Sequence, residues 1–139
     1  MGLLKEAVVT EEDRSRLGEM IRSLRTIGDP FRYHLRELED RLRHATAVRQ
    51  AALDPGVVSM NSTVRVVDLD TGRADTLTLV YHGQAGVFDN RLSVLTPLGL
   101  KLVGSHVGDE IEWQVPAGVR RLKVERILYQ PEAAGHFNL

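Results

Sequence analysis

The pattern of apolar and polar positions changes once along the chain, at Asp54-Pro55-Gly56. Before this point apolar residues recur at three- and four-residue spacing, which is typical of amphipathic helices. After it, short runs alternate between apolar and polar residues, which is typical of strands with one solvated face. Because the residue before a proline is driven away from helix, this tripeptide predicts a boundary between a first unit, residues 1–54, and a second, residues 55–139.

The spacing predicts a first helix that begins after Thr10 and ends at Gly28. The Thr10 hydroxyl is placed to accept a hydrogen bond from the amide of Asp13, and Glu11 and Glu12 join Asp13 at the positive end of the helix dipole. The expected apolar stripe of this helix consists of Leu17, Met20, Ile21, Leu24 and Ile27.

A second helix is predicted from Asp29-Pro30 to about residue 53, since aspartate is a good cap and proline is tolerated in the first turn. Its apolar positions follow a coiled-coil rhythm of four and three, with Arg49 at the missing step. Exposed pairs Glu37–Arg41 and Glu39–Arg43 are expected on its solvated face. Residues 10–53 should therefore form an antiparallel helical hairpin, a short coiled coil about 30 Å long. The apolar positions of the seam are Phe31, Leu35, Leu38, Leu42, Ala45 and Ala52.

The second unit alternates in short runs, separated by the glycine-containing hairpin signals Asp70-Thr71-Gly72 and Pro116-Ala117-Gly118. The alternation changes phase between Val124 and Ile127, which predicts a bulge near Glu125-Arg126. A mostly antiparallel sheet with one short helix gives an α+β fold class. The expected strands are residues 57–60, 63–69, 74–82, 91–95, 110–115 and 119–129, and the expected helix is 97–103.

Composition narrows the possible partners and compartments. The chain has 139 residues, a formal net charge of -1 and no cysteine, which excludes disulfides and cysteine-ligated zinc. A net charge this close to zero gives no overall signature for nucleic acid or anionic lipid. Lys5 and Glu6 interrupt the N-terminal apolar run, so neither a signal peptide nor a membrane span is expected. A cytoplasmic protein with a protein partner is the simplest interpretation.

The common catalytic motifs are missing from the sequence, and the histidines at 34, 44, 82, 106 and 136 show no ligand spacing. We therefore expect no enzyme activity, no cofactor and no metal site. Trp113 and Tyr129 allow two interpretations: the floor of a prolyl-isomerase pocket, or side chains of the core.

The run from Ser93 to Gly118, with Thr96-Pro97-Leu98, a short apolar segment, a Gly-Asp turn and an alternating strand, resembles the C-terminal domain of the GreA/GreB transcript-cleavage factors. Within that superfamily, residues 57–62 (Val-Val-Ser-Met-Asn-Ser) and 129–135 (Tyr-Gln-Pro-Glu-Ala-Ala-Gly) resemble the Rnk branch, the regulators of nucleoside diphosphate kinase. The resemblance implies an FKBP-like second unit. It also implies a bacterial transcription regulator that binds RNA polymerase near its secondary channel.

The same resemblance supplies candidate site residues. In the cleavage factors, acidic side chains at the hairpin tip help to hold the catalytic metal; here Gly28-Asp29-Pro30 offers one carboxylate, between Arg25 and Arg32. Asp29 is also explained as a helix cap. We therefore expect a factor that competes with GreA/GreB-type proteins without supporting transcript cleavage.

Thr96-Pro97-Leu98 aligns with the Ser-Pro-hydrophobic loop through which the superfamily docks on polymerase. In this docking interpretation Leu98 would be exposed. The same residues also fit a simple helix start with a threonine cap, in which Leu98 would belong to the core. Two other functions stay open, a prolyl isomerase or chaperone and a dimerising interaction module. Otherwise a monomer without direct sequence-specific binding to nucleic acid is expected.

Overall fold

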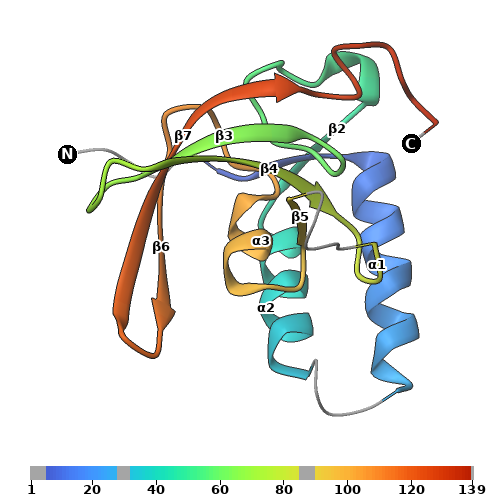
Figure 1. Ribbon diagram of the computed structural model, residues 1–139. Helices are drawn as coiled ribbons and strands as arrows, with labels where there is room; N and C mark the ends of the chain where they lie inside the picture. The colour runs from blue at the N-terminus through green and yellow to red at the C-terminus, as the bar shows by residue number, and fades with distance from the viewer. Residues whose placement is uncertain (1–5, 28–31, 85–89, 139) are drawn as a thin grey trace.

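The computed structural model describes residues 6–27, 32–84 and 90–138, which form a mixed α+β fold with the three α-helices on one side of a curled sheet (Figure 1). No helix among these residues is long and apolar enough to cross a membrane. The elements in chain order are β1 (Val8–Thr10), α1 (Glu11–Arg25), α2 (Arg32–Arg43), β2 (Thr46–Val48), the 3-10 helix η2 (Gln50–Ala52), β3 (Thr63–Asp68), β4 (Ala74–Val80), β5 (Arg91–Ser93), α3 (Pro97–Leu102), β6 (Glu110–Val115) and β7 (Gly118–Tyr129).

The strands of the described residues form a 5-stranded sheet in the order β5-β4-β3-β7-β6 and a 2-stranded sheet of β1 and β2. β3 pairs antiparallel with β4 and β7, and β6 pairs antiparallel with β7, whereas β5 runs parallel to β4. Both predicted hairpins are present, with Gly72 at φ 75° and Gly118 at φ 136° in their turns. Residues 57–60 were expected to be a strand, but only Val57 pairs, in an isolated bridge with His106.

β7 pairs with β3 through two bulges. Arg65 lies opposite Arg126 while Val66 lies opposite Val124, so Glu125 is the extra residue and the predicted bulge is confirmed. A second shift, between Thr63 and Val64, leaves Leu128 as another extra residue. The phase change in the sequence predicted the first bulge, but not the second.

The first helix begins where the sequence predicts, since the amide of Asp13 donates to the Thr10 hydroxyl at 3.0 Å. It ends at Arg25, and Ile27 is 68% exposed, so the expectation that Ile27 joins the buried stripe is wrong. α1 and α2 then run side by side in opposite directions (Figure 1).

The second helix is shorter than the sequence indicates. It ends at Arg43, and the expected helical continuation to residue 53 is wrong. Thr46–Val48 instead pairs in parallel with Val8–Thr10, and the β-branched residues of both segments suit this extended pairing. With 15 and 12 residues, the two helices are only about 22 and 18 Å long.

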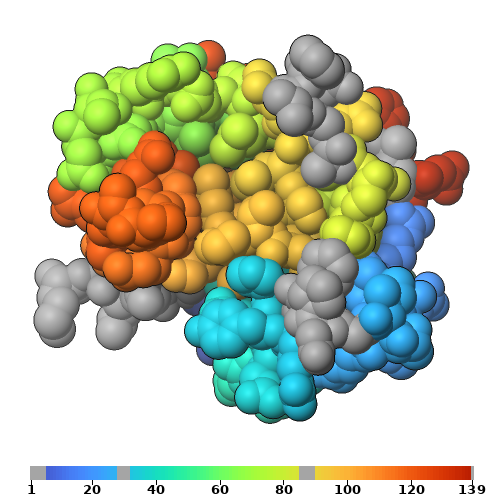
Figure 2. All heavy atoms as spheres, turned by 60° about the horizontal axis from the view of Figure 1, so that its bottom comes forward, coloured from blue at the N-terminus to red at the C-terminus, as the bar shows by residue number. Residues whose placement is uncertain are grey.

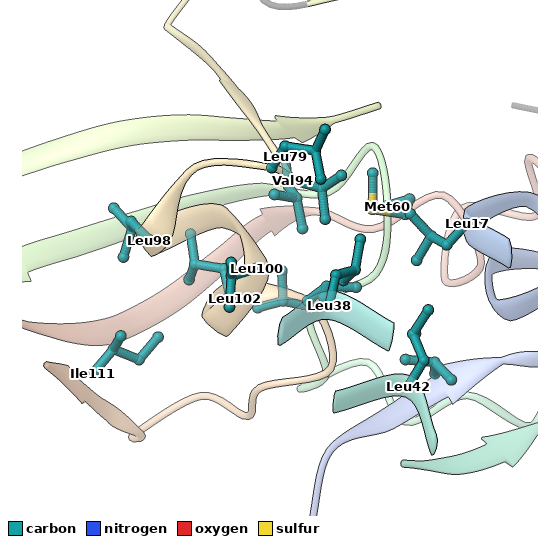
Figure 3. Close-up of a cluster of buried hydrophobic side chains, with 14 of the residues drawn as sticks. Leu17, Leu38, Leu42, Met60, Leu79, Val94, Leu98, Leu100, Leu102 and Ile111 are labelled. Atoms are coloured by element: carbon teal, nitrogen blue, oxygen red, sulfur yellow. The ribbon is translucent and has the colours of Figure 1, made fainter. Parts of the chain in front are cut away.

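One apolar cluster joins the helices to the sheet. Leu17 of α1 and Leu38 of α2 are 0% exposed, and they share this cluster with Met60, Leu79 and other side chains that follow residue 55 (Figure 3). The helical residues therefore bury their stripe against the sheet side of the molecule as well as against each other. Packing of this kind supplies most of the stability of short helices.

Candidate functional site

The loop that leads into α3 is fixed by its own hydrogen bonds. The Thr96 hydroxyl donates to the Ser93 carbonyl at 2.7 Å and accepts from the amide of Gly99 at 3.0 Å. Thr96 thus caps α3, and Pro97 occupies its first turn, as the capping interpretation predicts. These hydrogen bonds constrain the shape of the loop.

Gly99 is required by this geometry. A Cβ atom at residue 99 would lie 2.0 Å from the Ser93 carbonyl oxygen and 2.8 Å from the Thr96 hydroxyl oxygen. The first turn of α3 therefore packs against residue 93 so closely that a side chain is excluded. The sequence alone does not reveal this close contact between residue 99 and the Ser93 carbonyl.

The three residues of the candidate loop differ in exposure. Pro97 is exposed and Thr96 is half-buried, whereas Leu98 is only 8% exposed and belongs to the apolar cluster. The expectation of an exposed Leu98 is therefore wrong, because α3 turns that side chain toward Leu100 and Ile111 (Figure 3). Figure 2 shows the segment around α3 in the middle of one face, between the helical pair and the β6–β7 turn.

The hairpin tip, Gly28-Asp29-Pro30, lies outside the described residues. Near it, Arg25 forms a double hydrogen bond with Glu39, at 2.9 and 2.7 Å, which joins α1 to α2. This hydrogen bond to Arg25 lowers the pKa of Glu39 below its ordinary value. Of the two pairs expected along α2, Glu39–Arg43 is present at 3.9 Å.

Arg41 does not form the expected pair with Glu37. Its guanidinium instead donates to the carbonyls of Val103 at 2.8 Å and Lys101 at 2.9 Å, and so connects α2 to the end of α3. Burial is the main cause that lowers the pKa of Arg41. Cations near a helix C-terminus also interact favourably with its dipole.

A buried carboxylate makes a second connection between the helical pair and the rest of the molecule. Asp13 is 6% exposed; it accepts the amide N–H of Met60 at 3.0 Å and the hydroxyl of Tyr81 at 3.4 Å. Burial raises the pKa of Asp13 to about 6, against the opposing effect of the Met60 hydrogen bond. Arg41 and Asp13 thus each connect one helix of the pair to residues that follow position 55.

A pocket of about 380 Å³ is lined by Arg16, Asn61, Tyr81 and Gln84, of which Tyr81 contacts the carboxylate of Asp13. Asn61 has a φ of 67°, a left-handed conformation that asparagine tolerates better than most residues. No group of three potential metal ligands occurs among the residues described.

The two aromatic residues considered for a prolyl-isomerase pocket are far apart. Trp113 lies opposite Arg120 near the start of β7, with the guanidinium 5.6 Å from the ring centre. Tyr129 ends the same strand, about 30 Å away at the usual rise per residue, and its hydroxyl contacts His136 at 2.6 Å. The two rings therefore cannot form the floor of one pocket.

Residues 53–129 match the family model described as transcription elongation factor GreA/GreB, C-terminal. The chain belongs to the GreA/GreB family. The match includes the bulged sheet, α3 and the Thr96-Pro97-Leu98 loop, so the resemblance seen in the sequence is confirmed.

Relatives within the family carry two kinds of name. The chain is 44% identical over 84 residues to the regulator of nucleoside diphosphate kinase from Escherichia coli, a match that covers 60% of this chain and 62% of that protein. It is 32% identical over 134 residues to transcription elongation factor GreA from Chelativorans, covering 86% of this chain and 85% of that protein. The chain thus spans about three fifths of the regulators it matches and most of this GreA relative.

A solved structure agrees with the fold. The transcription elongation factor GreA/GreB from Nitrosomonas europaea superimposes with a TM-score of 0.74 at 32% identity, covering 90% of this chain and 99% of that one. The likeness extends over the helical pair as well as the sheet, because nine tenths of the chain is included.

Proposed function

We propose that this chain is a non-enzymatic, cytoplasmic transcription regulator that binds RNA polymerase near the secondary channel and competes with GreA/GreB-type factors without supporting transcript cleavage. The observation that carries the proposal is the family match over residues 53–129, which contains the complete α3 loop. The fold alone would not suffice, since one fold serves many functions.

We propose that Thr96 and Pro97 contact RNA polymerase directly. Leu98 packs in the apolar cluster beneath them and holds the loop in place. Thr96 is tied to Ser93 and Gly99 by hydrogen bonds, and Pro97 is exposed at the helix start. A loop constrained in this way loses less conformational freedom on binding, which favours affinity. Leu98 contributes through packing, because it is almost fully buried.

Pro97→Glu tests this contact. A carboxylate suits the first turn of a helix, so the melting temperature should stay close to that of the parent protein. Co-purification and competition with a GreA-type factor should show polymerase affinity reduced by about tenfold, as expected for loss of an interface anchor. Ala51→Glu, which adds the same charge at an exposed position of η2, is the matched control and should bind normally. Equal affinity of the two variants would move the contact elsewhere.

The proposal that cleavage is not supported rests on the hairpin. Helices of 15 and 12 residues give a short arm, and Asp29 is the one acidic residue in the sequence between Arg25 and Arg32. A single carboxylate provides only part of what a magnesium ion requires. Stalled, backtracked elongation complexes incubated with the protein and Mg²⁺ should keep their RNA at full length, and rapid shortening of the RNA would refute the proposal.

We further propose that residues 1–54 form the arm and residues 55–139 an FKBP-like unit, in a monomeric protein. The fragment 55–139 should fold but melt below the full chain, because Leu17, Leu35 and Leu38 no longer cover its apolar cluster. Circular dichroism tests the fragment, and the absence of a cooperative melt would contradict the division. Sedimentation of the full chain at low concentration distinguishes a monomer from a dimerising module.

A further inference from the structure

A groove runs between α1 and α2, with a volume of about 420 Å³. Gly18, Ile21 and Leu42 are the small and apolar residues that line it; Ile21 and Leu42 are 3% and 6% exposed. The groove shares no residue with the Thr96-Pro97-Leu98 loop. The other lining residues are charged: Arg14, Arg22, Glu39 and Arg43.

Gly18 lines the groove, and the fold does not require a glycine at this position. It lies in the middle of α1, where glycine costs about 0.5–1 kcal/mol relative to alanine. Its φ is not positive, and an added Cβ would meet only the Arg22 Nη1 atom, at 3.7 Å. Neither backbone conformation nor packing therefore explains the glycine. Its effect is to leave an unfilled space beside two apolar side chains.

The rim of the groove carries uncompensated positive charge. Arg14 and Arg22 are exposed, lie at four-residue spacing on either side of Gly18, and have no ion-pair partner among the described residues. Glu39, the acidic lining residue, is already engaged by Arg25 at 2.7 Å. This local excess contrasts with the net charge of -1 for the whole chain.

We propose that this groove binds an acidic segment of a partner protein, with one apolar side chain placed over Gly18 and carboxylates paired with Arg14 and Arg22. Charge complementarity and the apolar floor both favour such a segment. Single-stranded nucleic acid fits less well, because none of the groove residues named above has an aromatic ring on which a base could stack.

The test uses the full chain labelled with ¹⁵N and a synthetic peptide in which acidic residues alternate with leucine. Amide shifts should concentrate at Gly18, Ile21 and Leu42, with the peptide binding weakly. A peptide with serine in place of leucine and a peptide with lysine in place of the acidic residues should each bind at least about tenfold more weakly, since each removes one of the two contributions. Absence of localised shifts with the acidic-leucine peptide would overturn the proposal.

Two variants locate the binding. Gly18→Gln fills the groove with a good helix former, so binding should fall by about tenfold while the melting temperature stays the same or rises. Arg14→Gln combined with Arg22→Gln should weaken binding by about fivefold to tenfold, the range for two exposed ion pairs. Arg36→Gln, an exposed arginine of α2 outside the groove, is the matched control and should change binding less than about twofold.

The remaining outcomes are equally decisive. An equal loss of binding in Arg36→Gln would indicate unspecific attraction and overturn the proposal. Unchanged peptide affinity in Gly18→Gln would do the same. If an oligo-uridylate RNA shifted the groove amides and the peptide did not, the partner would be nucleic acid and the assignment to a protein segment would be wrong.

Discussion

Replacing Asp13 by asparagine should raise the free energy of unfolding at neutral pH and flatten its dependence on pH. The carboxyl group is buried and holds the Met60 amide at 3.0 Å. Burial raises its pKa to about 6, the Met60 hydrogen bond lowers it, and the negative charge of Glu132 raises it further. The ionised form is thus the costly one in the folded protein.

The size of the effect follows from the two pKa values. The folded-state pKa of about 6 exceeds the ordinary value of 3.8, so the folded protein binds more protons than the unfolded chain between these pH values. The contribution of Asp13 to the free energy of unfolding therefore falls as pH rises through this window and is constant above about pH 7. At about 1.4 kcal/mol per pKa unit, the loss amounts to about 3 kcal/mol.

Asparagine cannot ionise, but its amide oxygen can still accept the Met60 N–H. We expect Asp13→Asn to unfold with a free energy about 1–3 kcal/mol higher than the parent at pH 7 and nearly equal to it at pH 4. Asp13→Ala should be destabilised at both pH values, since it leaves the Met60 N–H without its acceptor at a cost of about 1–3 kcal/mol.

Urea unfolding of the parent and both variants at pH 4, 5, 6 and 7 measures these differences. Glu132→Gln is the control for the neighbouring charge: it should move the window to lower pH without removing it. A difference between parent and Asp13→Asn that is the same at pH 4 and pH 7 would refute the reasoning, because ionisation of Asp13 would then have no part in it.

Three further predictions concern positions where the structure is tight. Gly99→Ala should lower the free energy of unfolding, measured by thermal unfolding, by at least about 3 kcal/mol, because its Cβ would lie 2.0 Å from the Ser93 carbonyl oxygen. Gly18→Ala should raise it by about 0.5–1 kcal/mol. The reverse order of the two variants would contradict the packing described. Arg41→Met should lower the free energy of unfolding in urea by about 1–3 kcal/mol, since the carbonyls of Val103 and Lys101 lose their donor. An unchanged urea midpoint would mean that water replaces the guanidinium. Leu98→Glu should lower the melting temperature measured by circular dichroism, since it buries a carboxylate at a cost of several kcal/mol, and an unchanged melt would disprove the burial.

Local signals in the sequence were sufficient for much of the fold. The threonine caps at Thr10 and Thr96 and the bulge at Glu125 all depend on neighbouring residues, and all three are found. The predicted end of the second helix is wrong. Ala45 fits the coiled-coil rhythm, but the chain leaves the helix after Arg43 and then pairs with β1. The β-branched residues suit an extended conformation in both segments, but neither three-residue segment shows in its own sequence that it pairs with the other.

The candidate site shows the same limit. Asp13 occupies a capping position and Arg41 lies on a face that suits an exposed pair, so both are fully explained by their own helices. Their side chains instead contact Met60 and the end of α3, far away in sequence. Only the packed fold reveals such contacts, since they depend on which surfaces meet.

The pairing of β1 with β2 closes the base of the helical pair, because these strands immediately precede α1 and follow α2. Each helix can therefore gain or lose whole turns at its far end while the base keeps its register. Adding seven residues to both helices would extend the arm by about 10 Å and preserve the coiled-coil phase. The length of the arm can thus change without any change in the Thr96-Pro97-Leu98 loop, which lies outside the helical pair.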